Sequence, residues 1–137
     1  MFAAIDISTS ALVAQRTNLD VIAGNIANSY TTRGADGTAY RRRVAIFAEG
    51  NPAAGKSAPG VHVRSIERDP SPFRKEHNPS HPDAVQSGPD QGYVLMPNVD
   101  PSTEMVNAMM AVRAYEANVT VMEISKSMAA AALRLLA

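Results

Sequence analysis

Two histidines, His77 and His81, lie four residues apart in the segment HNPSHPD and belong to a residue type that binds zinc. Two histidines four residues apart point to the same side of the backbone only when the segment is helical. The two prolines within the segment exclude a helix. A third ligand would have to come from Asp83 or from the distant His62. Turn-forming residues flanked by proline explain the same segment without a metal. We therefore predict no metal site and no cofactor.

The only basic run is Arg41-Arg42-Arg43. A nucleic-acid site needs more positive charge and stacking aromatics, for which Tyr40 and Phe47 are the only nearby candidates. In a strand, Arg41 and Arg43 would share one face opposite Arg42, so the run does not form one patch. The whole chain balances 13 basic against 13 acidic residues. We predict no nucleic-acid binding and expect a solvated or partner-facing strand edge.

Catalytic residues are not grouped in any recognisable pattern. The chain has no cysteine, which excludes thiol nucleophiles, thiolate metal ligands and disulfides. It has no glycine-rich phosphate loop after a strand, no G-x-S-x-G and no H-E-x-x-H. Glu67 and Asp69 are close together but lie among Arg64, Arg68 and Arg74, which favours ion pairing over acid–base chemistry. We predict that the protein is not an enzyme and has no small-molecule substrate.

The elements that must position these residues follow from the prolines. All nine prolines lie between Pro52 and Pro101, so only the two ends of the 137-residue chain permit long helices. We predict an amino arm (1–29), a middle section (30–101) and a carboxyl arm (102–137). The segments 40–48 and 61–66 are rich in β-branched residues and predict a hairpin, and 92–96 could add an extended segment. We expect 49–60 and 69–90 to be loops.

The carboxyl arm has the clearest helical pattern. Asp100 is a suitable N-cap, Pro101 suits the first helical position, and Glu104 adds negative charge to the first turn. Apolar residues then recur at spacings of three and four, as in a heptad seam: Met105, Ala108, Val112, Tyr115, Val119, Met122, Ala129, Leu133 and Leu136. A second apolar stripe comprises Val106, Met110, Ala117, Val121, Ile124, Met128 and Leu135.

The amino arm matches this pattern, with Ile5, Leu12, Leu19 and Ile26 spaced seven residues apart. An ordinary helical hairpin core is one explanation of these stripes. However, two helices bury one face each against one another, so a second stripe leaves apolar surface uncovered and favours self-association. No apolar run reaches the roughly 18–20 residues needed to span a bilayer, and the first residues do not resemble a secretory signal. The predicted fold is mainly α with a small β part.

Several segments of the chain form a recognisable series. The middle of the chain carries DPSPFRKEHNPSHPD at 69–83 and GYVLMPNVD at 92–100, and RAYEANVT follows at 113–120. Together they resemble the bacterial flagellar basal-body rod proteins, most specifically the proximal rod family of the C type. The segment LDVIAGNIAN at 19–28 is similar to the signature of the wider rod and hook axial family. The resemblance covers nearly the whole chain, with apparent expansions at 33–38 and 85–91.

This resemblance implies a non-enzymatic structural subunit that assembles helically with its own copies and related rod subunits. It also implies passage through the flagellar type III export apparatus without a cleaved signal, and a place in the rod that crosses the periplasm and forms a drive shaft and export channel. Expected neighbours are the membrane (MS) ring with the export gate on one side and the distal rod on the other. The two arms (1–29 and 102–137) would pair as a coiled-coil-like inner domain, with 30–101 as a small outer domain.

From the stripes and this resemblance we expect three sets of site residues. The assembly seam would comprise Ile5, Leu12, Leu19, Ile26, Met105, Val112, Tyr115, Val119, Met122, Leu133 and Leu136. Buried asparagines would set the register of the subunits: Asn18, Asn25, Asn28 and Asn118. The outer contacts would be Arg41, Arg43, Pro72, Phe73, Arg74 and His81. The alternatives are another rod or hook axial subunit, which would normally carry a longer middle section, and a metal-binding loop protein using His77 and His81.

Overall fold

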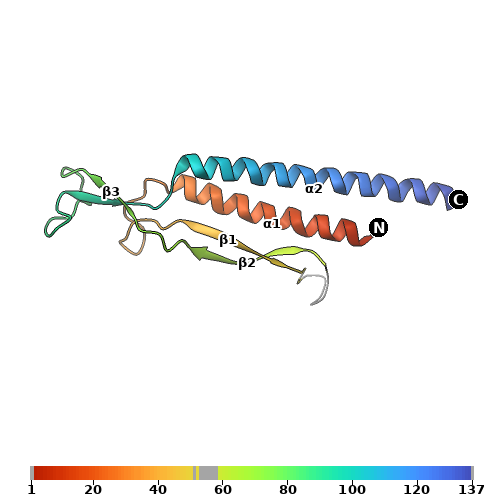
Figure 1. Cartoon of the computed structure of the whole chain (residues 1–137), viewed down its shortest axis with the longest axis horizontal. Coiled ribbons are helices and arrows are strands. Elements are labelled where there is room, and N and C mark those ends of the chain that lie inside the picture. The colour runs from red at the N-terminus through yellow and green to blue at the C-terminus, as the bar shows by residue number, and fades with distance from the viewer. Residues whose placement is uncertain (1, 51, 53–58, 137) are drawn as a thin grey trace.

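The computed structural model describes residues 2–50, 52 and 59–136 of the chain. Within these residues it has two long helices at the ends of the chain and two small antiparallel sheets between them (Figure 1). The predicted fold class, mainly α with a small β part, is therefore confirmed. None of the described helices is long and apolar enough to cross a membrane.

Helix α1 spans Phe2–Ala27, which agrees with the proline-free amino arm. The segment after it ends the helix through local hydrogen bonds. Asn28 donates both its backbone N–H and its side-chain amide to the carbonyl of Gly24, and the Ser29 hydroxyl donates to the carbonyl of Ile26. These side chains satisfy carbonyl groups that a helix end leaves without partners.

Helix α2 spans Pro101–Leu136. Its start is the predicted one, because the Asp100 carboxylate accepts the backbone N–H groups of Ser102 and Thr103. These hydrogen bonds, with that of the Thr103 hydroxyl, hold the pKa of Asp100 below its ordinary value. Pro101 costs nothing at this position, since the first N–H of a helix has no partner within the helix.

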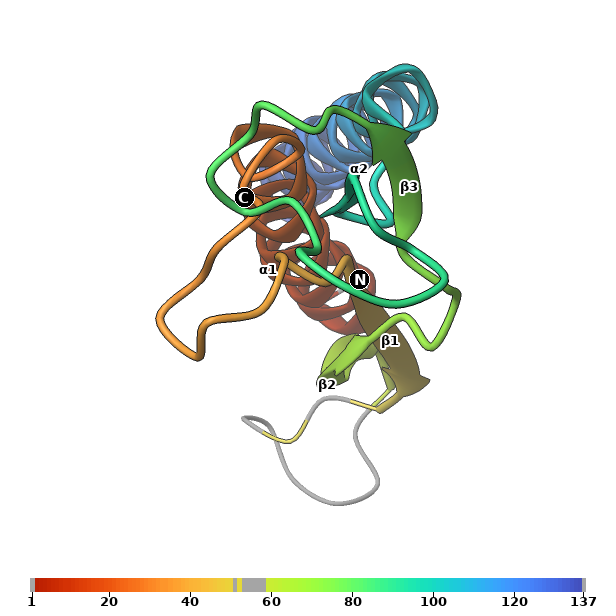
Figure 2. The same ribbon diagram turned by 90° about the vertical axis from the view of Figure 1, so that its left-hand side faces the viewer.

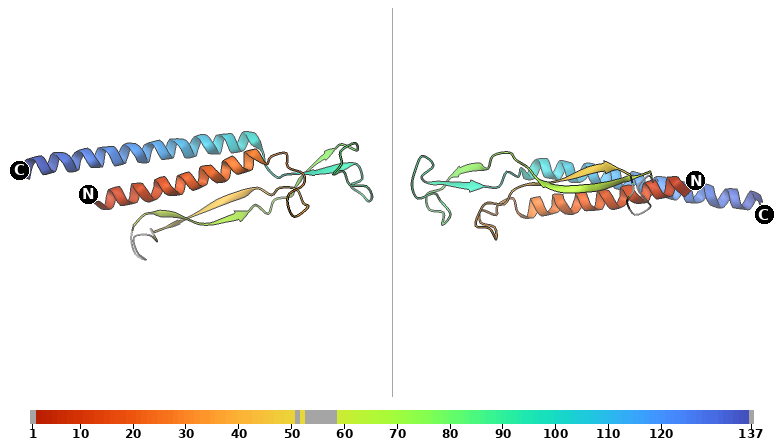
Figure 3. Two further views of the ribbon diagram at one scale, coloured as in Figure 1. Left: turned by 180° about the vertical axis from the view of Figure 1, so that it is seen from behind. Right: turned by 90° about the horizontal axis from the view of Figure 1, so that it is seen from below.

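The two helices run antiparallel, and both ends of the chain lie at the same end of the molecule (Figure 1). Helix α1 lies between α2 and the sheet of β1 and β2, as the end-on view shows (Figure 2). Helix α2 is the longer, and its last turns continue past the start of α1 (Figure 3). Within the described part of the chain, no other helix or strand lies beside this end of α2.

Strands β1 (Arg43–Glu49) and β2 (Val61–Arg68) form the predicted antiparallel hairpin, with a register shift between Ile46 and Phe47. The first strand begins at Arg43 rather than at the predicted Tyr40. The backbone N–H of Tyr40 donates to the Thr31 carbonyl, and that of Arg42 donates to Asn98 Oδ1. These groups are therefore not available to a strand ladder.

The second sheet pairs β3 (Arg74–His77) with β4 (Tyr93–Met96) at the end of the molecule away from the termini. The expectation that 69–90 is all loop is wrong for β3. Its four side chains are charged or histidine and all are exposed, so the sequence has no apolar alternation there. Backbone pairing with β4 forms this strand, and β4 anchors the sheet through buried Val94 and Met96.

The buried core is small. Its apolar members are five alanines and four larger residues: Ala14, Ile22, Ala39, Ala45, Ala84, Val94, Met96, Val99 and Ala111. The chain exposes 9209 Å² to solvent, whereas a compact monomer of 14.6 kDa exposes about 6,900 Å². The elongated shape thus leaves more surface in contact with water than a globular fold of this mass does.

Candidate assembly surface

The asparagine Asn25, which lies near the end of α1, is fully buried and uses all of its hydrogen-bonding groups. Its Oδ1 accepts the backbone N–H of Arg43 at 2.9 Å and the Tyr40 hydroxyl at 3.0 Å. Its Nδ2 donates to the Arg43 carbonyl at 2.8 Å and to Glu104 Oε2 at 2.9 Å. One side chain therefore joins α1, β1 and the first turn of α2.

The carboxylate of Glu104 is the second member of this group and is also fully buried. Its Oε1 accepts Nε and Nη2 of Arg42 at 2.8 and 2.7 Å. Arg42 Nη1 also lies 3.2 Å from Asp69 Oδ2. Burial acts to lower the pKa of Arg42, but the hydrogen bonds and charges of Glu104 and Asp69 outweigh it and raise the pKa. The buried charges are thus paired, as stability requires.

A third set of contacts extends this group toward the β3–β4 sheet. The Asn98 side chain accepts the backbone N–H of Arg42 at 2.8 Å and donates to the Ser71 hydroxyl at 2.8 Å. The backbone N–H of Ser71 lowers the pKa of Asp69, with a smaller contribution from Arg42. We call Asn25, Arg42, Asp69, Asn98 and Glu104 the polar junction. It fixes the helices, the hairpin and the β3–β4 sheet relative to one another.

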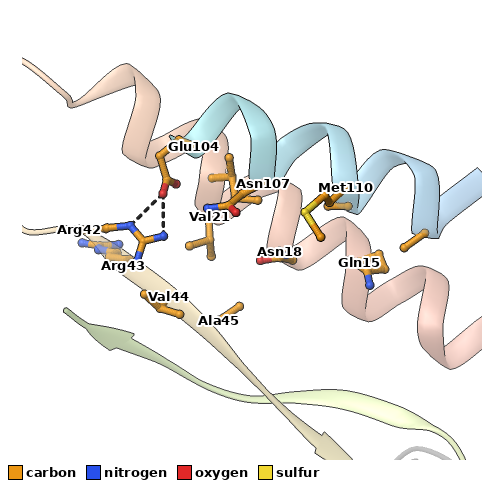
Figure 4. Close-up of a pocket in the computed structure, with 13 residues that line it drawn as sticks. Gln15, Asn18, Val21, Arg42, Arg43, Val44, Ala45, Glu104, Asn107 and Met110 are labelled. Atoms are coloured by element: carbon orange, nitrogen blue, oxygen red, sulfur yellow. Dashed lines mark hydrogen bonds and ion pairs between the residues drawn. The ribbon is translucent and has the colours of Figure 1, made fainter. Parts of the chain in front are cut away.

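A trough of about 390 Å³ begins at the polar junction and runs between α1, α2 and β1 (Figure 4). Arg42 and Glu104 close one end, where their ion pair is drawn. Met110 lies on its α2 side and is 66% exposed. Gln15, on α1, has a buried Oε1 without a hydrogen-bond partner among the described residues. The trough is therefore lined by both apolar and polar side chains, and one of its acceptors is unsatisfied.

The first half of the α2 face that packs against α1 is rich in small residues. Ala111 is buried there, and Ala108 and Ala114 are partly buried. Several apolar residues are instead exposed, in a series at helical spacing that we call the outer stripe: Val106, Met110, Ala117, Val121, Ile124 and Met128. Its large members are between 48% and 66% exposed. The small residues let the helices approach closely, and the larger apolar residues of the outer stripe stay exposed.

Comparison with known proteins identifies the family. The family model described as "Flagella basal body rod protein" matches residues 5–35, and the model described as "Flagellar basal body rod FlgEFG protein C-terminal" matches residues 90–135. A flagellar basal-body rod protein FlgC from Borreliella burgdorferi is 45% identical over 99% of this chain and 97% of its own length. The FlgC proteins of Bacillus subtilis (38%; 98% and 97%) and Salmonella typhimurium (42%; 90% and 88%) are also similar.

The chain belongs to the FlgC family of flagellar basal-body rod proteins. It is a structural subunit of the rod and assembles with other rod subunits in the flagellar basal body. The two family models cover the arms and leave most of the middle section unmatched, whereas the FlgC relatives align across the middle as well. The likeness to FlgC thus extends beyond the two segments that the family models match.

The residues predicted for the assembly seam divide into two groups in this rod subunit. Most are partly buried along the helical hairpin: Ile5, Leu12, Leu19, Ile26, Tyr115, Val119 and Met122. Met105, Val112 and Leu133 are exposed by 58%, 41% and 68% and do not pack in the hairpin core. The side chain of Leu136 lies outside the described part of the structure. Glu104 and Ala111, which lie one residue before Met105 and Val112, are buried in their place.

The four asparagines predicted to set register occupy different environments. Asn25 belongs to the polar junction, and Asn18 lines the trough. Asn28 and Asn118 donate to carbonyls of their own helices, those of Gly24 and Ala114. Only Asn25 connects different elements among the hydrogen bonds of these four side chains in the described residues.

The predicted outer contacts lie in two parts of the middle section, at the start of β1 and around β3. The Arg41 guanidinium lies 4.3 Å from the centre of the Phe73 ring and donates to the carbonyls of Asp69 and Ser71. Three others are exposed: Arg43, Pro72 and Arg74. His81 is partly buried, and its Nδ1 accepts the backbone N–H of Asp83.

The histidine loop has no metal-binding arrangement in the described residues, which contain no group of three potential ligands. His77 instead packs edge-to-face against Tyr93 with ring centres 5.0 Å apart. Asp83 pairs with Arg33 and accepts the Thr32 hydroxyl. These contacts join the loop to the segment after α1 and to β4.

The sequence reasoning missed the polar junction. It interpreted Glu104 as a first-turn charge and Arg42 as a solvated or partner-facing residue, whereas both are paired in the interior. The pairs join positions 62 and 79 residues apart. One signal was present, because Arg42 would point opposite to Arg41 and Arg43 in a strand and thus toward the helices.

Proposed function

We propose that the outer stripe and the trough form the surface through which this rod subunit packs against neighbouring subunits. The observation that carries the proposal is that Val106, Val121, Ile124 and Met128 of α2 are between 48% and 60% exposed, and that Met110, which lines the trough, is 66% exposed. Contiguous apolar surface of this kind marks an interaction site in soluble proteins. The unsatisfied Gln15 Oε1 in the trough supports the same proposal, because a neighbouring donor would satisfy it.

A contact between different faces of successive copies does not close on itself and generates a helical assembly. In this assembly the arms, 1–29 and 102–137, form the inner domain, and 30–101 forms the outer domain. The predicted seam residues and Asn18, Asn25, Asn28 and Asn118 set the packing and register of the arms. Outer contacts then come from the middle section, including Pro72, Phe73, Arg74 and His81. The subunit acts mechanically and catalyses no reaction.

We place the subunit in the periplasmic part of the rod, between the membrane ring with its export gate and the distal rod. Passage through the flagellar type III export apparatus would bring it there. This placement rests on the family membership and on the likeness of the arms to the wider group of rod proteins. It requires the chain to cross the export channel before its arms pack together.

The arms are further proposed to complete their folding on assembly. Ordering a backbone costs about 1–2 kcal/mol per residue, and burial returns about 25 cal/mol per Å² of apolar area. Ala111 is the one apolar residue of α2 that is buried among the described residues, and the last turns of α2 extend past α1. Neighbouring subunits supply the missing burial in this proposal.

The test is a charge placed in the outer stripe. Ile124→Asp and Met128→Asp alter side chains that are 52% and 60% exposed, so they should leave the isolated chain folded. Cells that produce either variant as their only copy should not swim, and their basal bodies should lack complete rods by electron microscopy. A variant on the seam, Leu133→Asp, should behave in the same way.

The matched control is Ala130→Asp on another side of α2. This residue is exposed, and Lys126 and Arg134 lie one turn before and after it, so an added carboxylate has favourable neighbours. The control should swim normally. Normal swimming of Ile124→Asp and Met128→Asp would overturn the assignment of the outer stripe as an assembly surface.

A further inference from the structure

The hairpin begins with two arginines directly opposite each other, since Arg43 of β1 pairs with Arg68 of β2. The adjacent backbone hydrogen bond runs from Asp69 N–H to the Arg42 carbonyl, and the N–H and carbonyl of Arg43 bond to Asn25 instead. The Arg43–Arg68 pair is therefore of the non-hydrogen-bonded kind, in which opposite side chains lie closest. Like charges in such a pair destabilise a sheet.

These two side chains line a hollow of about 280 Å³, together with Arg41, Tyr40 and Phe73. The aromatic rings hold two of the guanidiniums. That of Arg41 lies over the Phe73 ring, and that of Arg43 lies 5.9 Å from the centre of the Tyr40 ring. Cation–π contacts of this kind orient a guanidinium without neutralising its charge.

The hollow carries uncompensated positive charge. Among the described residues, none of Arg41, Arg43 and Arg68 takes part in an ion pair. Asp36 is the one carboxylate that lines the hollow, and its Oδ1 accepts the hydroxyl and the backbone N–H of Thr38. Three guanidiniums against one carboxylate leave a net charge of two within the hollow.

We propose that this hollow is a carboxylate-binding site and that its occupant is an acidic side chain of a neighbouring copy of the chain. Arginine binds carboxylates through two parallel hydrogen bonds, and guanidiniums held by aromatic rings are oriented for such bonding. Phe73 is covered by Arg41, so it offers no free ring for stacking against a nucleic-acid base. The repulsion between Arg43 and Arg68 in the free chain is relieved when the carboxylate binds.

We assign two exposed carboxylates of α2 as the matching acids. The net charge of zero means that a locally positive hollow is offset by acidic groups elsewhere in the chain. Glu116 and Glu123 lie seven residues apart on α2, are both exposed, and form no ion pair with any described residue. Seven residues are close to two helical turns, so both carboxylates face the same side. They are the groups assigned to the hollow of the next copy.

This proposal rests on the assembly of the rod subunit, and its test separates the two. Arg68→Glu places a carboxylate opposite Arg43 and replaces repulsion by attraction. The purified variant should therefore unfold at the same temperature as the unaltered chain or at a higher one, while cells that produce it should lose swimming. In a second experiment, Glu116→Arg combined with Glu123→Arg should also abolish swimming, because arginines of one copy would then face the guanidiniums of the hollow in the next.

The matched control is Arg64→Glu, which reverses an exposed charge on the same strand but outside the hollow and should leave swimming unchanged. Normal swimming of Arg68→Glu would overturn the carboxylate site, and a lower unfolding temperature would contradict the repulsion. Normal swimming of the double variant Glu116→Arg, Glu123→Arg would exclude these two carboxylates as the occupants. If both Arg68→Glu and Ile124→Asp swim normally, the proposed assembly surface itself is wrong. If Arg68→Glu swims normally but Ile124→Asp does not, only the carboxylate site is wrong.

Discussion

The side-chain amide of Asn25 makes both of the backbone hydrogen bonds that Arg43 does not make with β2. A residue of α1 thus takes the place of a neighbouring strand at the free edge of β1. Because the same amide binds Glu104 of α2, the position of the hairpin depends on the packing of the two helices. The outer part of the rod subunit is therefore coupled to its helical arms by one buried side chain.

Removing this amide should destabilise the chain strongly. Asn25→Ala leaves the backbone of Arg43, the Tyr40 hydroxyl and one oxygen of Glu104 without a partner. Each buried unsatisfied group costs about 1–3 kcal/mol, so we expect a total loss of about 2–4 kcal/mol after local relaxation. Urea unfolding of the purified chain measures it. Asn28→Ala, which removes only a helix-end hydrogen bond, should cost about 1 kcal/mol or less; equal losses in the two variants would contradict the central role of Asn25.

The pair of Glu104 and Arg42 should show strong energetic coupling. Removing one member leaves a charge in the interior and should cost about 3 kcal/mol or more for Glu104→Met, whose side chain is 1% exposed. Arg42→Met should cost less, since Arg42 is 23% exposed. The double variant should be less destabilised than the sum of the single variants by at least about 1 kcal/mol. Additive losses in a double-mutant cycle would argue against the pairing.

Stability should fall in acid. The pKa of Asp69 is lowered in the folded state, first by the backbone N–H of Ser71 and further by Arg42. A carboxyl with a depressed folded pKa stabilises the fold above its unfolded pKa of about 3.9 and loses this contribution as pH falls through the folded value. The unfolding free energy should be flat between about pH 7 and 5 and decline below about pH 4.

Asp69→Asn should remove part of this decline. Asp69 is partly exposed, so its loss at pH 7 should cost only about 0.5–1 kcal/mol. The unfolding curves of the variant and the unaltered chain should converge in acid. A constant difference in unfolding free energy from pH 7 to pH 2 would show that the Asp69 carboxylate is not the titrating group.

The sequence predicted the parts of the fold that depend on local chemistry. Asp100 and Pro101 mark the start of α2, and the absence of proline before Pro52 and after Pro101 permits both long helices. The β1–β2 hairpin followed from its β-branched residues. Strand β3 could not be predicted, because Arg74–His77 has neither apolar residues nor buried side chains and depends on a partner strand that starts 16 residues after its end.

The candidate site was predictable only in part. The sequence showed that α2 has more apolar surface than one hairpin can cover, and the exposed outer stripe agrees with that argument. It did not show which stripe packs inward. Glu104 and Ala111 are buried, rather than Met105 and Val112, because a buried ion pair and a close helix approach decide which residues of α2 face inward, and both depend on residues distant in the chain.

The free chain should be less ordered at the end of α2 than near the polar junction. Amide hydrogens beyond about residue 128 should exchange faster than those of 104–120, since α1 no longer accompanies the helix there. Circular dichroism should show helix content that rises with protein concentration. Two fully formed helices whose signal does not change on dilution would contradict folding on assembly.

The most direct test of the assembly surface uses the absence of cysteine in this chain, which makes a single introduced cysteine the only reactive thiol. Ile124→Cys is placed in the outer stripe, and Ser87→Cys, in the exposed loop between β3 and β4, serves as the reference. Maleimide labelling is measured in the purified monomer and in isolated basal bodies. We predict that Cys at position 124 reacts in the monomer and is protected at least tenfold in basal bodies relative to position 87. Equal labelling of position 124 in both states would contradict the account.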